Sequence, residues 1–153
     1  MRTGTRLGID VGKVRVGVAR SDPHGMIATP VETVQRSAKS IATILAFANE
    51  YDAVELVVGL PIALSGRDTP STADAREFAQ QLADSSELTV RLVDERMTTM
   101  SAQSALRASG RTAKNSRSVV DQVAAVIILQ HALDFERSAA RPPGELVEPT
   151  LGS

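Results

Sequence analysis

The spacing of hydrophobic residues changes along this chain from a period of two to a period near 3.6. Val14, Val16 and Val18 alternate with small or charged residues, as in a strand whose two faces differ. Residues 38–49 instead place Ile41 and Ile44 on one helical face. Short apolar runs then alternate with helical segments as far as residue 137. This order predicts an α/β fold in which helices flank a mixed sheet.

The pattern predicts five strands and four helices. The strands are expected at 6–10, 14–19, 26–34, 54–58 and 89–93, and the helices at 38–49, 69–83, 98–109 and 119–137. Pro30 predicts an edge position or a bulge for the third strand, because proline cannot donate to the ladder. Gly12 predicts a tight turn with a positive φ between the first two strands.

The length of 153 residues suits one domain with one core. We expect that domain over residues 1–137 and a flexible tail over 138–153, which contains Pro142-Pro143-Gly144. No apolar run reaches the length of a membrane span, so no membrane association is expected. The chain has no cysteine, which excludes disulfides and zinc–thiolate sites and makes a reducing, cytoplasmic location the default expectation.

Three acidic residues stand where the local sequence is apolar. Asp10 ends the first expected strand, Glu95 follows the fifth, and Asp121 lies in the first turn of the last helix. Ligand sites in open α/β sheets gather outside the carboxyl ends of the strands. A carboxylate close to a core must be paired, protonated or bound to a metal. Oxygen ligands without cysteine suit one or two Mg²⁺ or Mn²⁺ ions, which are a common means of hydrolysing phosphodiesters.

Each of these acids also has a purely structural interpretation. Asp121 fits the last position of a capping box that begins at Ser118. Asp10 could cap the turn that follows it, and Glu95 could pair with Arg96 on the surface. Asp94 is an alternative to Glu95 as the acid at this site, because neighbouring residues on a strand point to opposite faces and only one of the two would reach it. Spacing alone leaves these alternatives open.

Four ordered motifs resemble the YqgF family over about residues 5–136. They are residues 8–22 (GIDVGKVRVGVARSD), 57–61 (VVGLP), 93–99 (VDERMTT) and 120–130 (VDQVAAVIILQ). The resemblance implies an RNase H-like fold with a central mixed sheet of five strands. It also implies that Asp10, Glu95 and Asp121 are the catalytic, metal-binding acids, which favours Glu95 over Asp94 by analogy.

Net charge is only −1, but the basic residues are unevenly distributed. A stretch without acids runs from Arg96 to Val120, and a local basic surface can bind phosphates on a neutral chain. The alternative is that these are solvated surface charges. The expected substrate contacts are Lys13, Arg15, Arg96, Arg111, Lys114 and Arg117.

These observations predict a nuclease that hydrolyses phosphodiester bonds in structured nucleic acid. By resemblance the substrate is the 5′ end of pre-16S ribosomal RNA. The alternative substrate is a four-way DNA junction, which a homodimer rather than a monomer would resolve. A nucleotide-binding domain is a further alternative, since residues 8–12 resemble a phosphate-binding loop, although no G-x-x-x-x-G-K-[ST] motif is present. The last alternative is a non-catalytic nucleic-acid-binding protein.

Overall fold

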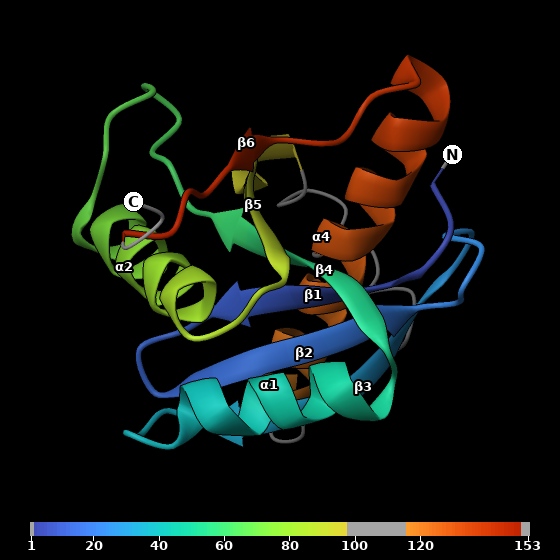
Figure 1. Ribbon diagram of the computed structural model, residues 1–153. Coiled ribbons are helices and arrows are strands. Elements are labelled where there is room, and N and C mark those ends of the chain that lie inside the picture. The colour runs from blue at the N-terminus through green and yellow to red at the C-terminus, as the bar shows by residue number, and fades with distance from the viewer. Residues whose placement is uncertain (1, 98–115, 151–153) are drawn as a thin grey trace.

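A six-stranded mixed sheet forms the centre of the computed structural model, which describes residues 2–97 and 116–150 (Figure 1). The strands are β1 (Thr5–Val11), β2 (Arg15–Ser21), β3 (Ala28–Gln35), β4 (Ala53–Leu60), β5 (Thr89–Asp94) and β6 (Glu145–Leu146). Their spatial order is β3-β2-β1-β4-β5-β6. The three central strands β1, β4 and β5 pair in parallel, and the other pairings are antiparallel. The predicted mixed sheet with flanking helices is confirmed, with six strands where five were expected.

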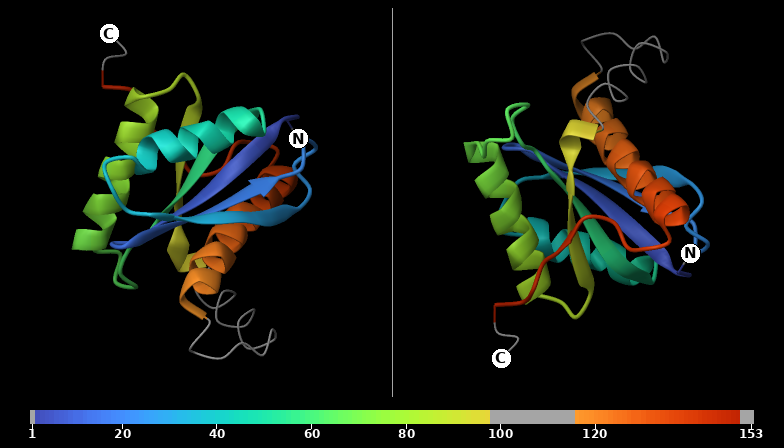
Figure 2. Two further views of the ribbon diagram at one scale, coloured as in Figure 1. Left: turned by 90° about the horizontal axis from the view of Figure 1, so that it is seen from below. Right: turned by 90° about the horizontal axis from the view of Figure 1, so that it is seen from above.

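Helices cover both faces of this sheet. In the described part of the chain they are α1 (Ser40–Glu50), α2 (Pro70–Asp84), the short 3₁₀ helix η1 (Glu95–Met97) and α4 (Ser116–Ala139). α1 and α2 pack on one face, and α4 crosses the other (Figure 2). The helix expected at 98–109 lies outside the described residues. None of the described helices combines the length and apolar character needed to cross a membrane.

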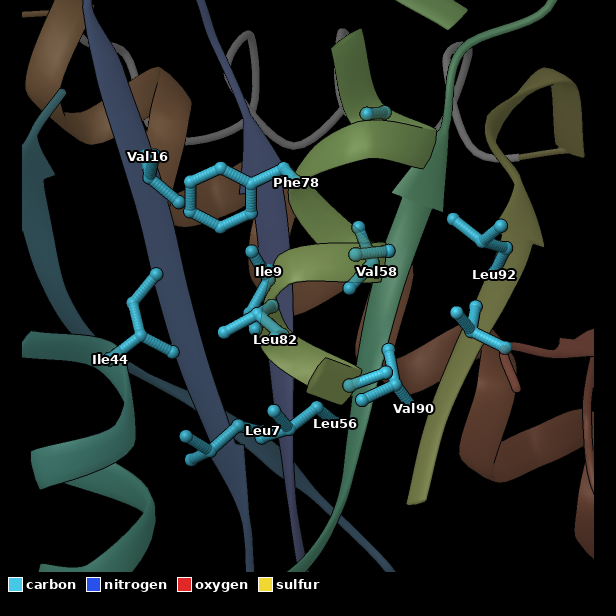
Figure 3. Packing of buried hydrophobic residues seen from close by; sticks show 14 of the residues in the cluster. Leu7, Ile9, Val16, Ile44, Leu56, Val58, Phe78, Leu82, Val90 and Leu92 are labelled. Carbon is cyan, nitrogen blue, oxygen red and sulfur yellow. The ribbon is translucent and has the colours of Figure 1, made fainter. Parts of the chain in front are cut away.

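The larger part of the core lies between the sheet and the α1/α2 layer. Leu7 and Ile9 of β1 meet Ile44 of α1 and Leu82 of α2 there (Figure 3). Residues of β1 alternate between this face and the face under α4, as the period of two requires. Asp10 therefore lies on the α4 side of the sheet.

Local sequence signals explain several boundaries. Thr69 caps α2, since its hydroxyl accepts from the Thr72 amide while Thr72 Oγ1 accepts from the Thr69 amide, and Pro70 occupies the first turn. Pro30 lies on the edge strand β3 beside a bulge, since Val18 pairs with Glu32 and Ala19 with Pro30, as predicted. Gly12 differs from its prediction, because its φ is not positive. Instead a Cβ there would lie 2.5 Å from the Arg15 carbonyl oxygen, so the turn needs glycine for space.

Part of the C-terminal segment, for which the sequence predicted a flexible tail over 138–153, contacts the rest of the fold. Residues 138–139 continue α4, and β6 pairs with β5. The Val147 amide donates to the Val90 carbonyl at 2.8 Å, and the Thr150 amide donates to Asp84 Oδ1 at 2.7 Å. Hydrogen-bonding groups on the edge of β5 explain this pairing, because an open edge accepts a further strand.

A cluster of buried charged residues links the C-terminal half of α4 to the sheet, at the end of the helix away from Asp10. Arg6 and Glu55 are each only 1% exposed, and Glu136 is 4% exposed. Arg2 bridges Glu55 at 3.0 Å and Glu136 at 2.6 Å, and Arg6 reaches Glu136 at 3.2 Å. Arg91 also forms an ion pair with Glu55, at 3.0 Å. These contacts fix the C-terminal half of α4 over β1 and β4.

Candidate metal centre

Parallel strands bring Asp10 and Glu95 to one edge of the sheet. Asp10 is the penultimate residue of β1, and Glu95 directly follows β5. β4 lies between these strands and pairs with both in parallel register, so all three carboxyl ends reach the same edge. Both acids are partly buried. Two carboxylates separated by 85 residues in sequence therefore meet beneath α4.

The electrostatic surroundings of Glu95 are unfavourable for a negative charge. Burial raises the pKa of Glu95 to about 7, and the negative charges of Asp10 and then Asp94 contribute to the same shift. The carboxylate of Asp10 is thus close enough to act on that of Glu95. A cation between the two would relieve this repulsion.

Asp94 has a different environment from its neighbour. Its carboxylate accepts from the Arg96 side chain at 2.6 to 3.1 Å and from the Arg96 amide at 2.9 Å. These hydrogen bonds lower the pKa of Asp94. Asp10 contributes to the pKa shift of Glu95 and not to that of Asp94, which favours Glu95 as the acid that acts with Asp10.

Asp121 belongs to the helix that lies over this edge. α4 begins at Ser116, so Asp121 is in its second turn and not in the first turn as expected. A capping box from Ser118 is excluded for the same reason, since Ser118 is already inside the helix. The Asp121 side chain lies outside the described residues. Its backbone precedes Ala125 by one turn, and Ala125 packs directly on Gly8 of β1.

The donor chemistry at this edge fits a hard divalent cation. Asp10 and Glu95 offer only oxygen atoms, which Mg²⁺ and Mn²⁺ prefer. No group of three or more histidine, cysteine or acidic residues is found among the side chains that the structure describes. Mg²⁺ takes six oxygen ligands, so an ion held by this pair would take its remaining ligands from water, from the substrate or from Asp121.

The expected phosphate-binding residues do not share one surface. Arg15 lies on the α4 side with Asp10, because Asp10 pairs with Gly17 and side chains alternate along β2. Lys13 instead lines an open groove of about 530 Å³ beside α2. Arg96 is bound to Asp94. Arg111 and Lys114 lie outside the described residues, and so does the side chain of Arg117, whose backbone starts α4.

Two structural residues near the centre were missed by the sequence analysis. Arg36 donates to the Gly12 carbonyl at 2.8 Å and to Asp74 at 2.8 and 2.9 Å, which ties the turn after Asp10 to α2. Gly59 lies beneath Glu95. The VVGLP motif contained Gly59, but nothing in the sequence showed what it faces.

The raised pKa of Glu95 predicts a specific pH dependence of stability. Between pH 4.5 and about 7 the folded protein keeps a proton that the unfolded chain has lost, so stability falls as the pH rises through this window. Glu95→Gln removes that cost. In chelator, urea unfolding is expected to find the variant more stable than the parent by up to about 3 kcal/mol at pH 8, and similar to it at pH 4.

Asp94→Asn serves as the control for this prediction. The pKa of Asp94 is lowered, so its neutralisation should slightly destabilise the protein at pH 8. Mn²⁺ added at pH 8 should stabilise the parent more than Glu95→Gln. An advantage of Glu95→Gln that is equal at pH 4 and pH 8 would contradict the assigned cause.

Comparisons with known proteins agree with this architecture. The family described as "RuvX: Holliday junction resolvase" matches residues 4–135. A protein of Clavibacter michiganensis subsp. michiganensis is 64% identical over 150 residues, covering 96% of this chain and 93% of its own. One from Leifsonia xyli subsp. xyli is 59% identical and covers 99% of both chains. Both carry the name "Putative pre-16S rRNA nuclease".

Solved structures of RuvC share the fold. The structure of "T. thermophilus RuvC in complex with Holliday junction substrate" aligns with a TM-score of 0.58 at 16% identity. The alignment covers 91% of this chain and 99% of RuvC. At this identity the likeness concerns the fold, which is the RNase H-like arrangement expected from the sequence.

Proposed function

The chain belongs to the RuvX family, and we propose that this nuclease cuts structured RNA at the 5′ end of the 16S ribosomal RNA precursor with the help of a divalent cation. The observation that carries the proposal is the meeting of Asp10 and Glu95 at one sheet edge, where the charge of Asp10 helps raise the Glu95 pKa. Two neighbouring carboxylates repel each other, and a divalent cation held between them would offset that repulsion. The names of the relatives support the RNA substrate.

Asp10, Glu95 and Asp121 are the residues proposed to hold Mg²⁺ or Mn²⁺. Held by these residues, the ion would increase the acidity of an attacking water and offset charge on the leaving oxygen. β1 carries Asp10 and Glu95 directly follows β5, so the rigid sheet would position both carboxylates toward the ion. Arg15 lies on the same face and is placed to contact a neighbouring phosphate.

Resolution of four-way DNA junctions is the second candidate. The description of the matching family names this activity. Two symmetric cuts require two active sites related by a two-fold axis, so this function predicts a homodimer. Processing of an RNA end carries no such requirement and is compatible with a monomer.

A direct comparison of substrates tests the proposal. Purified protein is incubated with precursor 16S RNA or with a synthetic four-way junction, in Mn²⁺, Mg²⁺ or chelator. The expected result is cleavage of the RNA with either metal and none in chelator. Faster cleavage of the junction by a dimeric protein would favour the second candidate. Cleavage that persists in chelator would overturn the metal-dependent mechanism.

The basic stretch from residue 111 to 117 predicts a salt-dependent contribution to binding. Neutralising Arg111, Lys114 and Arg117 together should weaken RNA binding and make the slope of log affinity against log salt shallower by up to about 2, because each phosphate contact releases counterions. Filter binding between low and moderate salt measures the slope. Neutralising Arg76, which is distant in sequence and pairs with Glu145, is the control and should leave it unchanged. An unaltered slope in the triple variant would show that this stretch does not contact the phosphates of the RNA.

A further inference from the structure

We infer that Gly59 is a positioning residue for Glu95: the empty volume above its Cα is where the Glu95 carboxylate rests as it faces Asp10. The inference rests on the proposed function, since it assigns Gly59 a part in the same metal centre. Gly59 belongs to the VVGLP motif and is the penultimate residue of β4. Its strand lies between β1, which carries Asp10, and β5, which Glu95 directly follows.

The need for glycine at this position comes from space rather than from backbone conformation. Gly59 does not have a positive φ. Glycine inside a strand weakens it, so its presence there points to a close approach by another group. A Cβ on residue 59 would lie 2.9 Å from both Cγ and Cδ of Glu95 and 2.5 Å from Cδ1 of Ile128.

Both contacts can be relieved by a movement of a side chain, but only one of these movements displaces an acid of the candidate centre. Cδ1 of Ile128 is the end of a flexible side chain and can move aside. Cδ of Glu95 is the carboxylate carbon and Cγ is the methylene next to it, and ordinary contacts to a Cβ begin at 3.4 Å. An added methyl would therefore displace the carboxylate by roughly 0.5 Å, which is the tolerance of a catalytic site.

Gly8 on the neighbouring strand shows what a purely packing glycine looks like here. A Cβ at Gly8 would meet Leu129 Cβ at 2.6 Å and the Ala125 carbonyl oxygen at 2.8 Å. Those atoms belong to α4, so Gly8 serves the approach of the helix to the sheet. Of these two glycines, only Gly59 has an acid of the candidate centre among its close neighbours.

The variant Gly59→Ala/Ile128→Val separates positioning from packing. Ile128→Val removes Cδ1 and leaves the added methyl pressed only against Glu95. Calorimetric titration with Mn²⁺ is expected to show binding about tenfold weaker than in Ile128→Val alone, and cleavage of precursor 16S RNA about 10- to 100-fold slower. The Tm should stay within a few degrees of that of Ile128→Val.

Val57→Ala is the control for general destabilisation. Val57 lies two residues before Gly59 on the same strand and is 1% exposed, so its truncation lowers the Tm without touching Glu95. Its Mn²⁺ affinity should equal that of the parent. A second, metal-free measurement follows the contact itself: the small loss of Tm caused by Gly59→Ala in the Ile128→Val background should disappear when Glu95 is also replaced by alanine.

The outcomes separate this inference from the proposed function. If the parent binds Mn²⁺ and cleaves RNA, while Gly59→Ala/Ile128→Val binds Mn²⁺ as tightly as Ile128→Val, the role of Gly59 is overturned and the proposed function stands. If the parent neither binds Mn²⁺ nor cleaves either substrate, the proposed function is overturned and the metal role of Gly59 with it.

Discussion

Asp10→Asn is expected to lower the rate of RNA cleavage by about a thousandfold while leaving the protein folded. Asparagine has nearly the same shape as aspartate but lacks the charge that a divalent ion needs. Loss of several kcal/mol of metal-assisted stabilisation of the transition state corresponds to this factor. Cleavage of precursor 16S RNA over a full Mn²⁺ titration measures the effect. Circular dichroism and Tm verify that the fold is intact.

Asp94→Asn is the matched control for this prediction. It makes the same change of atoms at the same sheet edge, but Asp94 is paired with Arg96. Its cleavage rate should stay within a few fold of the parent. Glu95→Gln and Asp121→Asn should show the same loss as Asp10→Asn. A rate equal to the parent's for Asp10→Asn would show that Asp10 takes no part in the reaction. A loss for Asp94→Asn as large as that for Asp10→Asn would contradict the assignment of Glu95 in place of Asp94.

Much of the fold could be predicted because it depends on residues that are close to one another in the sequence. The alternation Val14, Val16, Val18 predicted a two-faced strand because neighbouring side chains point to opposite sides of a sheet. Thr69-Pro70 predicted the start of α2. The threonine hydroxyl accepts a hydrogen bond from an amide of the first turn, and proline has no amide hydrogen that would need a partner there. The place of Asp10 at the end of a strand likewise follows from the local sequence and the rule for strand ends.

Contacts between distant residues could not be predicted in the same way. The pairing of β6 with β5 depends on an edge that only the folded sheet creates. Arg36 and Asp74 are 38 residues apart, and neither belongs to a periodic pattern. The meaning of Gly59 required the position of Glu95, which only tertiary structure supplies.

The buried charge cluster is the clearest case of this kind. Arg2 and Glu136 are 134 residues apart and lie in opposite ends of the chain. In the sequence they resemble ordinary surface charges, of which most are solvated. In the fold Glu136 accepts from Arg2 and Arg6 and is almost fully buried. Composition and spacing carry no sign of this arrangement.

Glu136→Gln is therefore expected to destabilise the protein at pH 7 by about 3–5 kcal/mol, since it leaves the buried Arg6 guanidinium without its counter-charge. Urea unfolding measures the loss, with a Tm lower by about 10 °C. Hydrogen bonds from Arg2 lower the pKa of Glu136, so its contribution is lost as the pH falls below the ordinary range of a glutamate. Parent and variant should converge in acid. Asp134→Asn on the same helix is the control, because Asp134 is 56% exposed in its pair with Arg137 and should cost less than about 1 kcal/mol. An equally small loss for Glu136→Gln at pH 7 would mean that the cluster does not hold α4 to the sheet.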